Sequence, residues 1–223
     1  MTMHPMGPGT PPHPVIPCTV LGRQLGDDGT KWLANYLAAM GALPQLHDLK
    51  LFQNQIGDSG LMSLADASTR GTLLGLSILD LSVNEIRDKG LKSLSEALGK
   101  GALSSLTDLG LSSNQIGDVG VVALSTVLSK GAASKLKELH LDENLIGDAG
   151  AEALAKACSG GAALQALEGL DLGSNKGIRD AGVDALSAAR ARGALPALKK
   201  IAVGTKRFRQ LVAACEPRGI AIS

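Results

Sequence analysis

The feature that most constrains this chain is an asparagine that returns almost every 30 residues. It occupies Asn54, Asn84, Asn114, Asn144 and Asn175, at intervals of 30, 30, 30 and 31. An aspartate follows each of them four or five residues later, at Asp58, Asp88, Asp118, Asp148 and Asp180. Self-similarity at such a period indicates repeated structural units that stack on one another.

Each unit contains a strand followed by a helix. Ahead of the asparagine, apolar residues alternate with open positions, as in Leu49-x-Leu51, and this period of two predicts a short half-buried strand. Behind it, leucines such as Leu91, Leu94 and Leu98 follow helical spacing. We expect the aspartate to be the N-cap of this helix, where its side chain would accept hydrogen bonds from the first-turn N–H groups.

Two series of glycines recur at fixed positions in the units. The first lies just past each helix, where the chain must turn through a conformation that glycine adopts most easily. Its members are Gly41, Gly71, Gly101, Gly131, Gly161 and Gly193. The second lies in the first helical turn, where glycine costs about 0.5–1 kcal/mol relative to alanine, and we expect close contact between helix and strand to compensate. Its members are Gly60, Gly90, Gly120, Gly150 and Gly182.

A single strand and helix cannot enclose a core. Stacked copies, by contrast, bury a continuous ribbon of leucine between a strand layer and a helix layer. The composition is 44% apolar and only 2% aromatic, so we expect a core made of Leu, Ala, Val and Ile. We therefore predict an α/β solenoid that occupies residues 18–223 as one domain.

The consensus Leu-x-x-Leu-x-Leu-x-x-Asn-x-Ile-Gly-Asp-x-Gly closely resembles the ribonuclease-inhibitor-like class of leucine-rich repeat, also seen in NOD-like receptors and the Ran GTPase-activating protein. The resemblance covers about residues 18–203, with insertions before Leu167 and at residues 176–177. It implies a horseshoe with parallel strands on its concave face and helices on its convex face. It also implies that the five asparagines form a ladder whose amides bond backbone groups of adjacent turns.

The N-terminal segment is rich in proline. Residues 1–17 hold six of the nine prolines, namely Pro5, Pro8, Pro11, Pro12, Pro14 and Pro17. This composition predicts a flexible tail, and Pro8-Gly-Thr-Pro11 is also a candidate polyproline-type ligand. The segment lacks the basic and apolar regions of a signal peptide. We therefore expect a cytoplasmic protein, with the nucleus as the alternative location.

The first repeat is degenerate. Cys18 takes the place of a core leucine, and Arg23 stands where the asparagine would be. Terminal repeats are often atypical because they cap a solenoid. We expect a helix at about Asp27–Met40 and expect its Trp32 and Tyr36 to close that end of the core. The alternative is a chain that is a fragment of a longer array.

The C-terminal end is basic. From residue 190 onward it holds eight basic residues and one acidic residue, a net charge of +7, which leaves −6 for residues 1–189. We expect a repeat strand within residues 195–203 and then a cap at about 204–223, with a helix at about Arg207–Cys215 and a strand at about Ile220–Ile222. We interpret this end as a solvated cap, the alternative being a contact for phosphate, nucleic acid or an acidic neighbour.

The sequence contains no arrangement typical of catalysis. There is no Walker loop, zinc-ligand spacing or nucleophile elbow. The three cysteines, Cys18, Cys158 and Cys215, form no C-x-x-C pair and are interpreted as reduced thiols. With 22 basic and 21 acidic residues, bulk charge favours neither nucleic acid nor membrane. We expect no enzyme activity, and no catalytic residue, metal site or cofactor.

The outward strand positions form a mildly acidic surface. The candidate partner-binding residues are Asp48, Phe52, Ile78, Asp80, Asp108, Glu138, His140, Asp142 and Asp171. We expect Phe52 and Ile78 to form one apolar spot that anchors a partner. The surrounding carboxylates would steer a basic protein segment towards it. The alternative is a sheet surface that is merely solvated.

These observations predict a monomeric, non-catalytic scaffold that binds a partner protein on the concave face or its rim. The alternative is a GTPase-activating or other regulatory effector of a small GTPase, which only the family resemblance suggests. The GTPase-activating branch typically has more repeats and an acidic C-terminal tail, whereas this chain ends basic and short. No residue here can be carried over as its active site.

Overall fold

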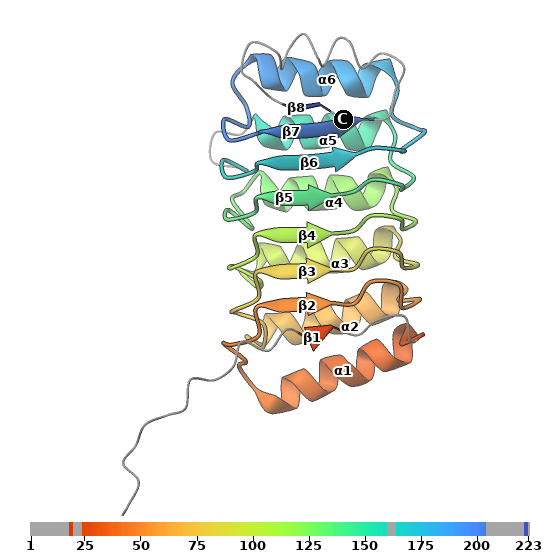
Figure 1. Ribbon diagram of the computed structural model, residues 1–223, viewed down its shortest axis with the longest axis vertical. Helices are drawn as coiled ribbons and strands as arrows, with labels where there is room; N and C mark the ends of the chain where they lie inside the picture. Colours follow the sequence, from red (N-terminus) through yellow and green to blue (C-terminus); the bar gives the residue numbers. More distant parts are fainter. Residues whose placement is uncertain (1–17, 20–23, 160–163, 204–220, 223) are drawn as a thin grey trace, which may run out of the picture.

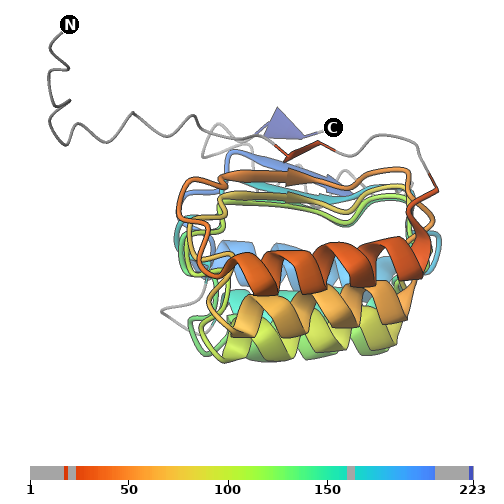
Figure 2. The same cartoon turned by 90° about the horizontal axis from the view of Figure 1, so that it is seen from below.

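A computed structural model describes residues 18–19, 24–159, 164–203 and 221–222. Within these ranges, eight strands form one parallel sheet in the order of the sequence, and six helices lie in a second layer (Figures 1 and 2). The strands are β1 Cys18–Thr19, β2 Asp48–Lys50, β3 Ile78–Asp80, β4 Asp108–Gly110, β5 Glu138–His140, β6 Gly169–Leu172, β7 Lys200–Val203 and β8 Ala221–Ile222. The helices are α1 Gly26–Met40, α2 Asp58–Thr69, α3 Asp88–Gly99, α4 Asp118–Leu128, α5 Asp148–Cys158 and α6 Asp180–Ala191.

Two predicted segments fall outside these ranges. They are the proline-rich tail, residues 1–17, and most of the cap, including its helix at 207–215. Among the described residues, no helix has both the length and the apolar character needed to cross a lipid bilayer.

Equivalent leucines of neighbouring strands stack on one another. Leu49, Leu79, Leu109 and Leu139 are paired in register across β2–β5, and each is at most 1% exposed. Helix leucines such as Leu94 belong to the same buried cluster. Burying one leucine contributes roughly 1.5–3 kcal/mol. The predicted α/β solenoid is confirmed, and its core is the expected ribbon between the two layers.

The glycines that follow the helices have the predicted left-handed conformation. The backbone φ angle lies between 76° and 87° at Gly41, Gly71, Gly101, Gly131 and Gly193. An L-residue with a side chain is strained in this region. Gly161, the remaining member of the series, lies outside the described residues.

The recurring asparagines join neighbouring repeats. Asn114 Nδ2 donates to the carbonyl oxygen of Leu81 in the preceding repeat at 3.0 Å. It also donates to those of Leu111 and Ser112 in its own repeat, both at 3.1 Å. Asn114 Oδ1 accepts from the Ile86 amide at 3.0 Å. The same pattern occurs at Asn84, Asn144 and Asn175. These amides supply partners to backbone groups that the turn between strand and helix buries.

The recurring aspartates form a second ladder, which corrects the N-cap prediction. The N-cap of α3 is Arg87, one residue before Asp88, and α3 has no side-chain cap of its own. Asp88 Oδ1 accepts instead from the amides of Gly117 at 2.8 Å and Gly120 at 2.9 Å, at the start of α4. The same link to the next helix is made by Asp27, Asp58, Asp118 and Asp148. The stacking of repeats places the N-termini of consecutive helices side by side. Each carboxylate therefore caps the N-terminus of the next helix.

The glycines in the first helical turn make room for this second ladder. A Cβ at Gly120 would lie 2.8 Å from Asp88 Oδ1 and 3.1 Å from the Asp88 Cα. Gly60 and Gly90 are similarly close to Asp27 and Asp58 of the preceding helix. Side chains cannot pack at such distances without displacing a neighbour. The expected helix–strand contact is therefore wrong, because the close contact joins the starts of neighbouring helices.

Trp32 and Tyr36 do not close the end of the core, contrary to expectation. They are 66% and 49% exposed. Their rings stack on each other with centroids 5.4 Å apart and planes inclined by 11°. Leu33 and Leu37 take the buried positions of α1 instead. One residue along an α-helix is a rotation of about 100°, which turns the two rings away from the core.

Candidate protein-docking face

The outward side chains of β2–β6 and of the residues that follow them make up one surface, the strand face. The middle residues of the three-residue strands, such as Leu109 in β4, are fully buried. The strand face consists of Asp48, Lys50, Phe52, Ile78, Asp80, Ser82, Asp108, Gly110, Ser112, Glu138, His140, Asp142, Gly169, Asp171 and Gly173. Every docking residue predicted from the sequence lies in this set.

Strand pairing arranges these residues in rows. The first row runs from β2 to β6 through Asp48, Ile78, Asp108, Glu138 and Gly169. The second runs through Lys50, Asp80, Gly110, His140 and Asp171. Adjacent strands lie about 4.8 Å apart, so Asp108 and Glu138, which are paired in the first row, are close neighbours. We call Asp48, Asp80, Asp108, Glu138, Asp142 and Asp171 the acidic band.

Phe52 and Ile78 do not form the single apolar spot that we expected. Ile78 is paired with Asp48, whereas Phe52 lies four residues further along the chain than Asp48. At about 3.3 Å per residue, the two positions are about 13 Å apart along the strand direction. The repeat period of 30 already implies this separation, because it places Ile78 opposite Asp48 and not opposite Phe52.

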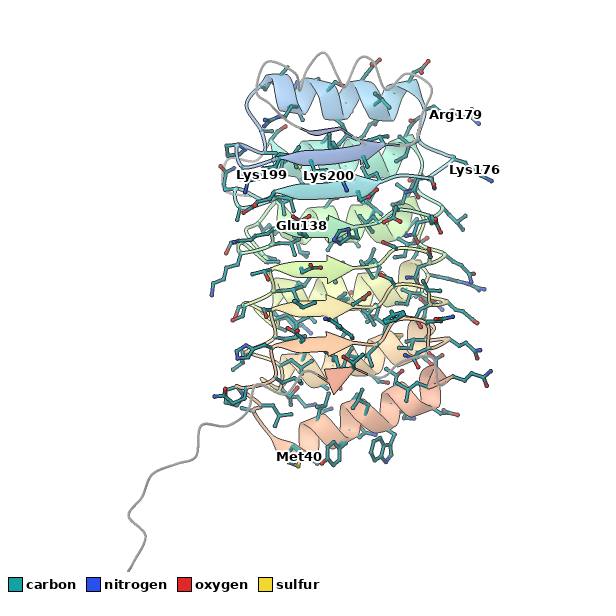
Figure 3. The ribbon with its side chains drawn as sticks, in the orientation of Figure 1. Met40, Glu138, Lys176, Arg179, Lys199 and Lys200 are labelled. Carbon is teal, nitrogen blue, oxygen red and sulfur yellow. The ribbon has the colours of Figure 1, made fainter. Side chains whose placement is uncertain are left out.

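Glycines on the strand face allow two carboxylates to lie flat across the sheet. A Cβ at Gly169 would overlap the Glu138 carboxylate, which extends from β5 (Figure 3). A Cβ at Gly110 would lie 2.8 Å from Asp80 Oδ1. Glu138 and Asp80 therefore extend over the neighbouring strand at Gly169 and Gly110.

Hydrogen bonds orient three carboxylates of the acidic band. Asp142 Oδ1 accepts from Ser112 Oγ at 2.5 Å. Asp171 Oδ1 accepts from the Gly173 amide at 2.9 Å, and Asp80 Oδ1 makes the same bond to the amide two residues on, at 3.0 Å. An ionised carboxylate accepts at both oxygens. A basic side chain can therefore bind here without breaking these contacts.

Asp108 lies on β4, the middle strand of the acidic band. Burial raises the pKa of Asp108, the nearby His140 and Lys50 oppose this change, and the carboxylates of Asp80 and Asp48 add to it. His140 Nε2 is 4.0 Å from Asp108 Oδ1. A carboxylate that is hard to ionise in the free protein gains from a cationic partner.

The raised pKa of Asp108 predicts a pH-dependent effect of the Asp108→Asn substitution. A group whose pKa is higher in the folded state stabilises the fold at low pH, and this contribution is lost as pH rises through the folded pKa. At pH 7.5 the ionised carboxylate therefore opposes folding. We expect Asp108→Asn, followed by urea unfolding, to raise the free energy of unfolding slightly at pH 7.5, by about 0.5 kcal/mol or less as for other half-exposed charges, and not to raise it at pH 3. A gain at pH 3 as large as at pH 7.5 contradicts this explanation.

The family comparison agrees with the repeat geometry. The Leucine Rich repeat family matches residues 43–65, 76–95, 102–125, 132–155 and 164–187, together just over half of the chain. This chain belongs to the leucine-rich repeat family. Each matched segment of the leucine-rich repeat array contains one strand and the start of the helix after it. Leucine-rich repeats generally mediate protein–protein interaction. No curated protein matches the chain.

The repeat array also brings together a group that the sequence analysis missed. One potential ligand atom from each of His140, Asp142 and Asp171 lies within 4.8 Å of the other two. His140 and Asp171 come from neighbouring strands, so their proximity depends on the pairing of β5 with β6. All three side chains are partly exposed. Asp142 and Asp171 belong to the acidic band, and His140 lies beside them.

The basic end of the array is only partly a charged surface. Arg190 is 5% exposed, and its guanidinium donates to two backbone carbonyls of the following turn, so it is a structural residue. Lys199 pairs with Glu168. Lys200 is exposed at the start of β7, beside the glycine end of the first row (Figure 3). Residues 204–220, which hold further basic residues, lie outside the described ranges.

Proposed function

We propose that this protein is a non-catalytic scaffold that binds a basic segment of a partner protein on its strand face or the adjoining rim. The observation that carries the proposal is the acidic band. Six carboxylates lie on one surface of the sheet, whereas the basic groups in its two rows on β2–β6 are Lys50 and His140.

The local chemistry suits recognition of a cationic chain. Three of the carboxylates are oriented before binding, and preorganised groups lose less conformational freedom when a partner arrives. Charge complementarity also accelerates encounter and disfavours acidic competitors. Phe52, just after β2, and Ile78, in β3, supply two separate apolar contacts beside the band.

Three finer assignments belong to the same proposal. The helix in each complete described repeat supports the ribonuclease-inhibitor-like class. We further propose that the protein acts as a monomer in the cytoplasm. No feature of the described residues favours the alternative role in GTP hydrolysis, so binding alone is proposed.

The proposal is tested by affinity capture from a lysate of the source cells with three full-length baits. One bait is the unmodified protein. The second carries Asp80→Lys, Asp108→Lys and Asp142→Lys on the strand face. The third is a matched control with the same change in net charge on exposed helix positions, namely Asp66→Lys, Glu96→Lys and Glu152→Lys.

We expect at least one protein to be retained by the unmodified and helix-face baits and to fall by about tenfold or more on the strand-face bait. Matching circular dichroism and urea midpoints would show that all three baits are folded. Equal retention of every captured protein by all three baits contradicts docking on the acidic band.

A further inference from the structure

The outer side of α1 carries an apolar stripe. Trp32, Tyr36 and Met40 are 66%, 49% and 56% exposed. Their spacing of four residues places them above one another on one side of the helix. Figure 3 shows Met40 on the side of α1 that faces away from the rest of the stack. We call these three residues the aromatic stripe.

The stripe differs from the same side of the inner helices. The residues equivalent to Tyr36 in α2, α3 and α5 are Ala67, Ala97 and Ala157, each at most 3% exposed. In α4 the equivalent residue is Val127, which lies against Gly99 of the preceding helix. This side is therefore a helix–helix contact inside the stack. On α1, the outermost helix at that end among the described residues (Figure 1), large rings replace the small side chains.

The parallel rings of Trp32 and Tyr36 suit a particular kind of occupant. Aromatic side chains exposed side by side are the surface on which proline-rich segments dock, because a polyproline II chain is already extended and loses little entropy on binding. Residues 1–17 of this chain hold six prolines and no Asp, Glu, Lys or Arg. Their composition matches an apolar stripe at the same end of the molecule.

The attachment point allows this segment to reach the stripe. β1 pairs Cys18 with Leu49 and runs parallel to β2, so β1 begins towards the side of the sheet where β2 begins and where α1 ends at Met40 (Figure 1). The stripe from Met40 to Trp32 spans about 12 Å of helix. Seventeen residues of polyproline II chain extend about 50 Å. The segment is therefore long enough to cross from the strand layer and lie along α1.

We propose that the proline-rich segment 1–17 docks on the aromatic stripe of its own molecule. The contact covers the apolar side of α1 and does not involve the strand face. It is therefore tested independently of the proposed partner binding. Any other occupant of the stripe, such as a second copy of the protein, has to displace this segment.

Trp32 is the sole tryptophan of the chain, so its fluorescence reports on the stripe directly. The test compares three full-length proteins. One is unmodified. The second, the proline variant, carries Pro5→Ser, Pro8→Ser, Pro11→Ser, Pro12→Ser and Pro14→Ser. The third is a tail control that keeps every proline and carries Gly7→Ser and Gly9→Ser. None of these substitutions falls in the described solenoid, and circular dichroism checks that it is intact.

We expect acrylamide to quench Trp32 roughly twice as efficiently in the proline variant as in the other two proteins, with a red-shifted emission maximum. These values should not change with protein concentration, because the contact is intramolecular. Identical quenching in all three proteins overturns the proposal. Protection of Trp32 that grows with protein concentration also overturns it and assigns the stripe to a second copy.

Discussion

Replacing Asn114 with alanine will lower the free energy of unfolding by about 1–3 kcal/mol. The loss falls mainly on the Ile86 amide, which donates to Asn114 Oδ1. The carbonyls of Leu81 and Leu111 each retain a second donor, from Asn84 and Asn144 of the neighbouring repeats. The expected loss of stability is therefore that of one buried N–H group without a partner, together with the three neutral hydrogen bonds that Asn114 Nδ2 donates.

Urea unfolding of the full-length protein measures this effect. Asn35→Ala is the matched control, because it makes the same chemical change at an exposed position of α1. We expect the control to have a free energy of unfolding within about 0.5 kcal/mol of that of the unmodified protein. A midpoint unchanged by Asn114→Ala would show that the ladder is not a source of stability.

Replacing Asp88 with alanine will lower the free energy of unfolding by about 1–2 kcal/mol, the size of a lost helix cap. The amides of Gly117 and Gly120 at the start of α4 lose the oxygen that they share. Asp88→Asn should cost less than half as much, because its amide oxygen still accepts both bonds while the charge near the helix start is lost. The exposed Asp184→Ala serves as the control.

The same ladder predicts weakening in acid. At its first member, burial tends to raise the pKa of Asp27, but the Ser59 hydroxyl and the amides of Gly60 and Gly57 outweigh burial and lower it. A lowered folded-state pKa stabilises the fold above the ordinary value of 3.8, and this contribution is lost as pH falls through the folded pKa. Asp27→Asn should therefore lower the urea midpoint at pH 7 and have no such effect once Asp27 is protonated. A loss at a pH where Asp27 is protonated that equals the loss at pH 7 would contradict the ladder explanation.

The repeated spacing was sufficient to predict the strand layer, the helix layer and the stacked leucine core. It was sufficient because a period near 30 determines which residues of neighbouring units lie side by side. The left-handed glycines, such as Gly71 and Gly101, follow from local backbone sterics and are equally readable from one unit.

The features that were not predicted are of two kinds, one that depends on the neighbouring helix and two that the residue spacing already contained. Asp88 looks like the cap of its own helix until the start of α4 is placed beside it. Phe52 and Ile78 both point outward, but the period near 30 already places Ile78 beside Asp48 and not beside Phe52. The size of Trp32 is typical of a core residue. Its position one residue before the buried Leu33, however, turns its side chain to the surface.

The central claim is that the acidic band is the docking site, and the most direct test is kinetic. The captured partner is mixed with the unmodified, strand-face and helix-face proteins, and the association rate constant is measured over a range of salt concentrations. We predict that the rate falls steeply with salt for the unmodified and helix-face proteins, because the charges that steer encounter are screened. For the strand-face protein we predict a slow rate that salt hardly changes. The same steep salt dependence in all three proteins would contradict the account and place the partner elsewhere on the molecule.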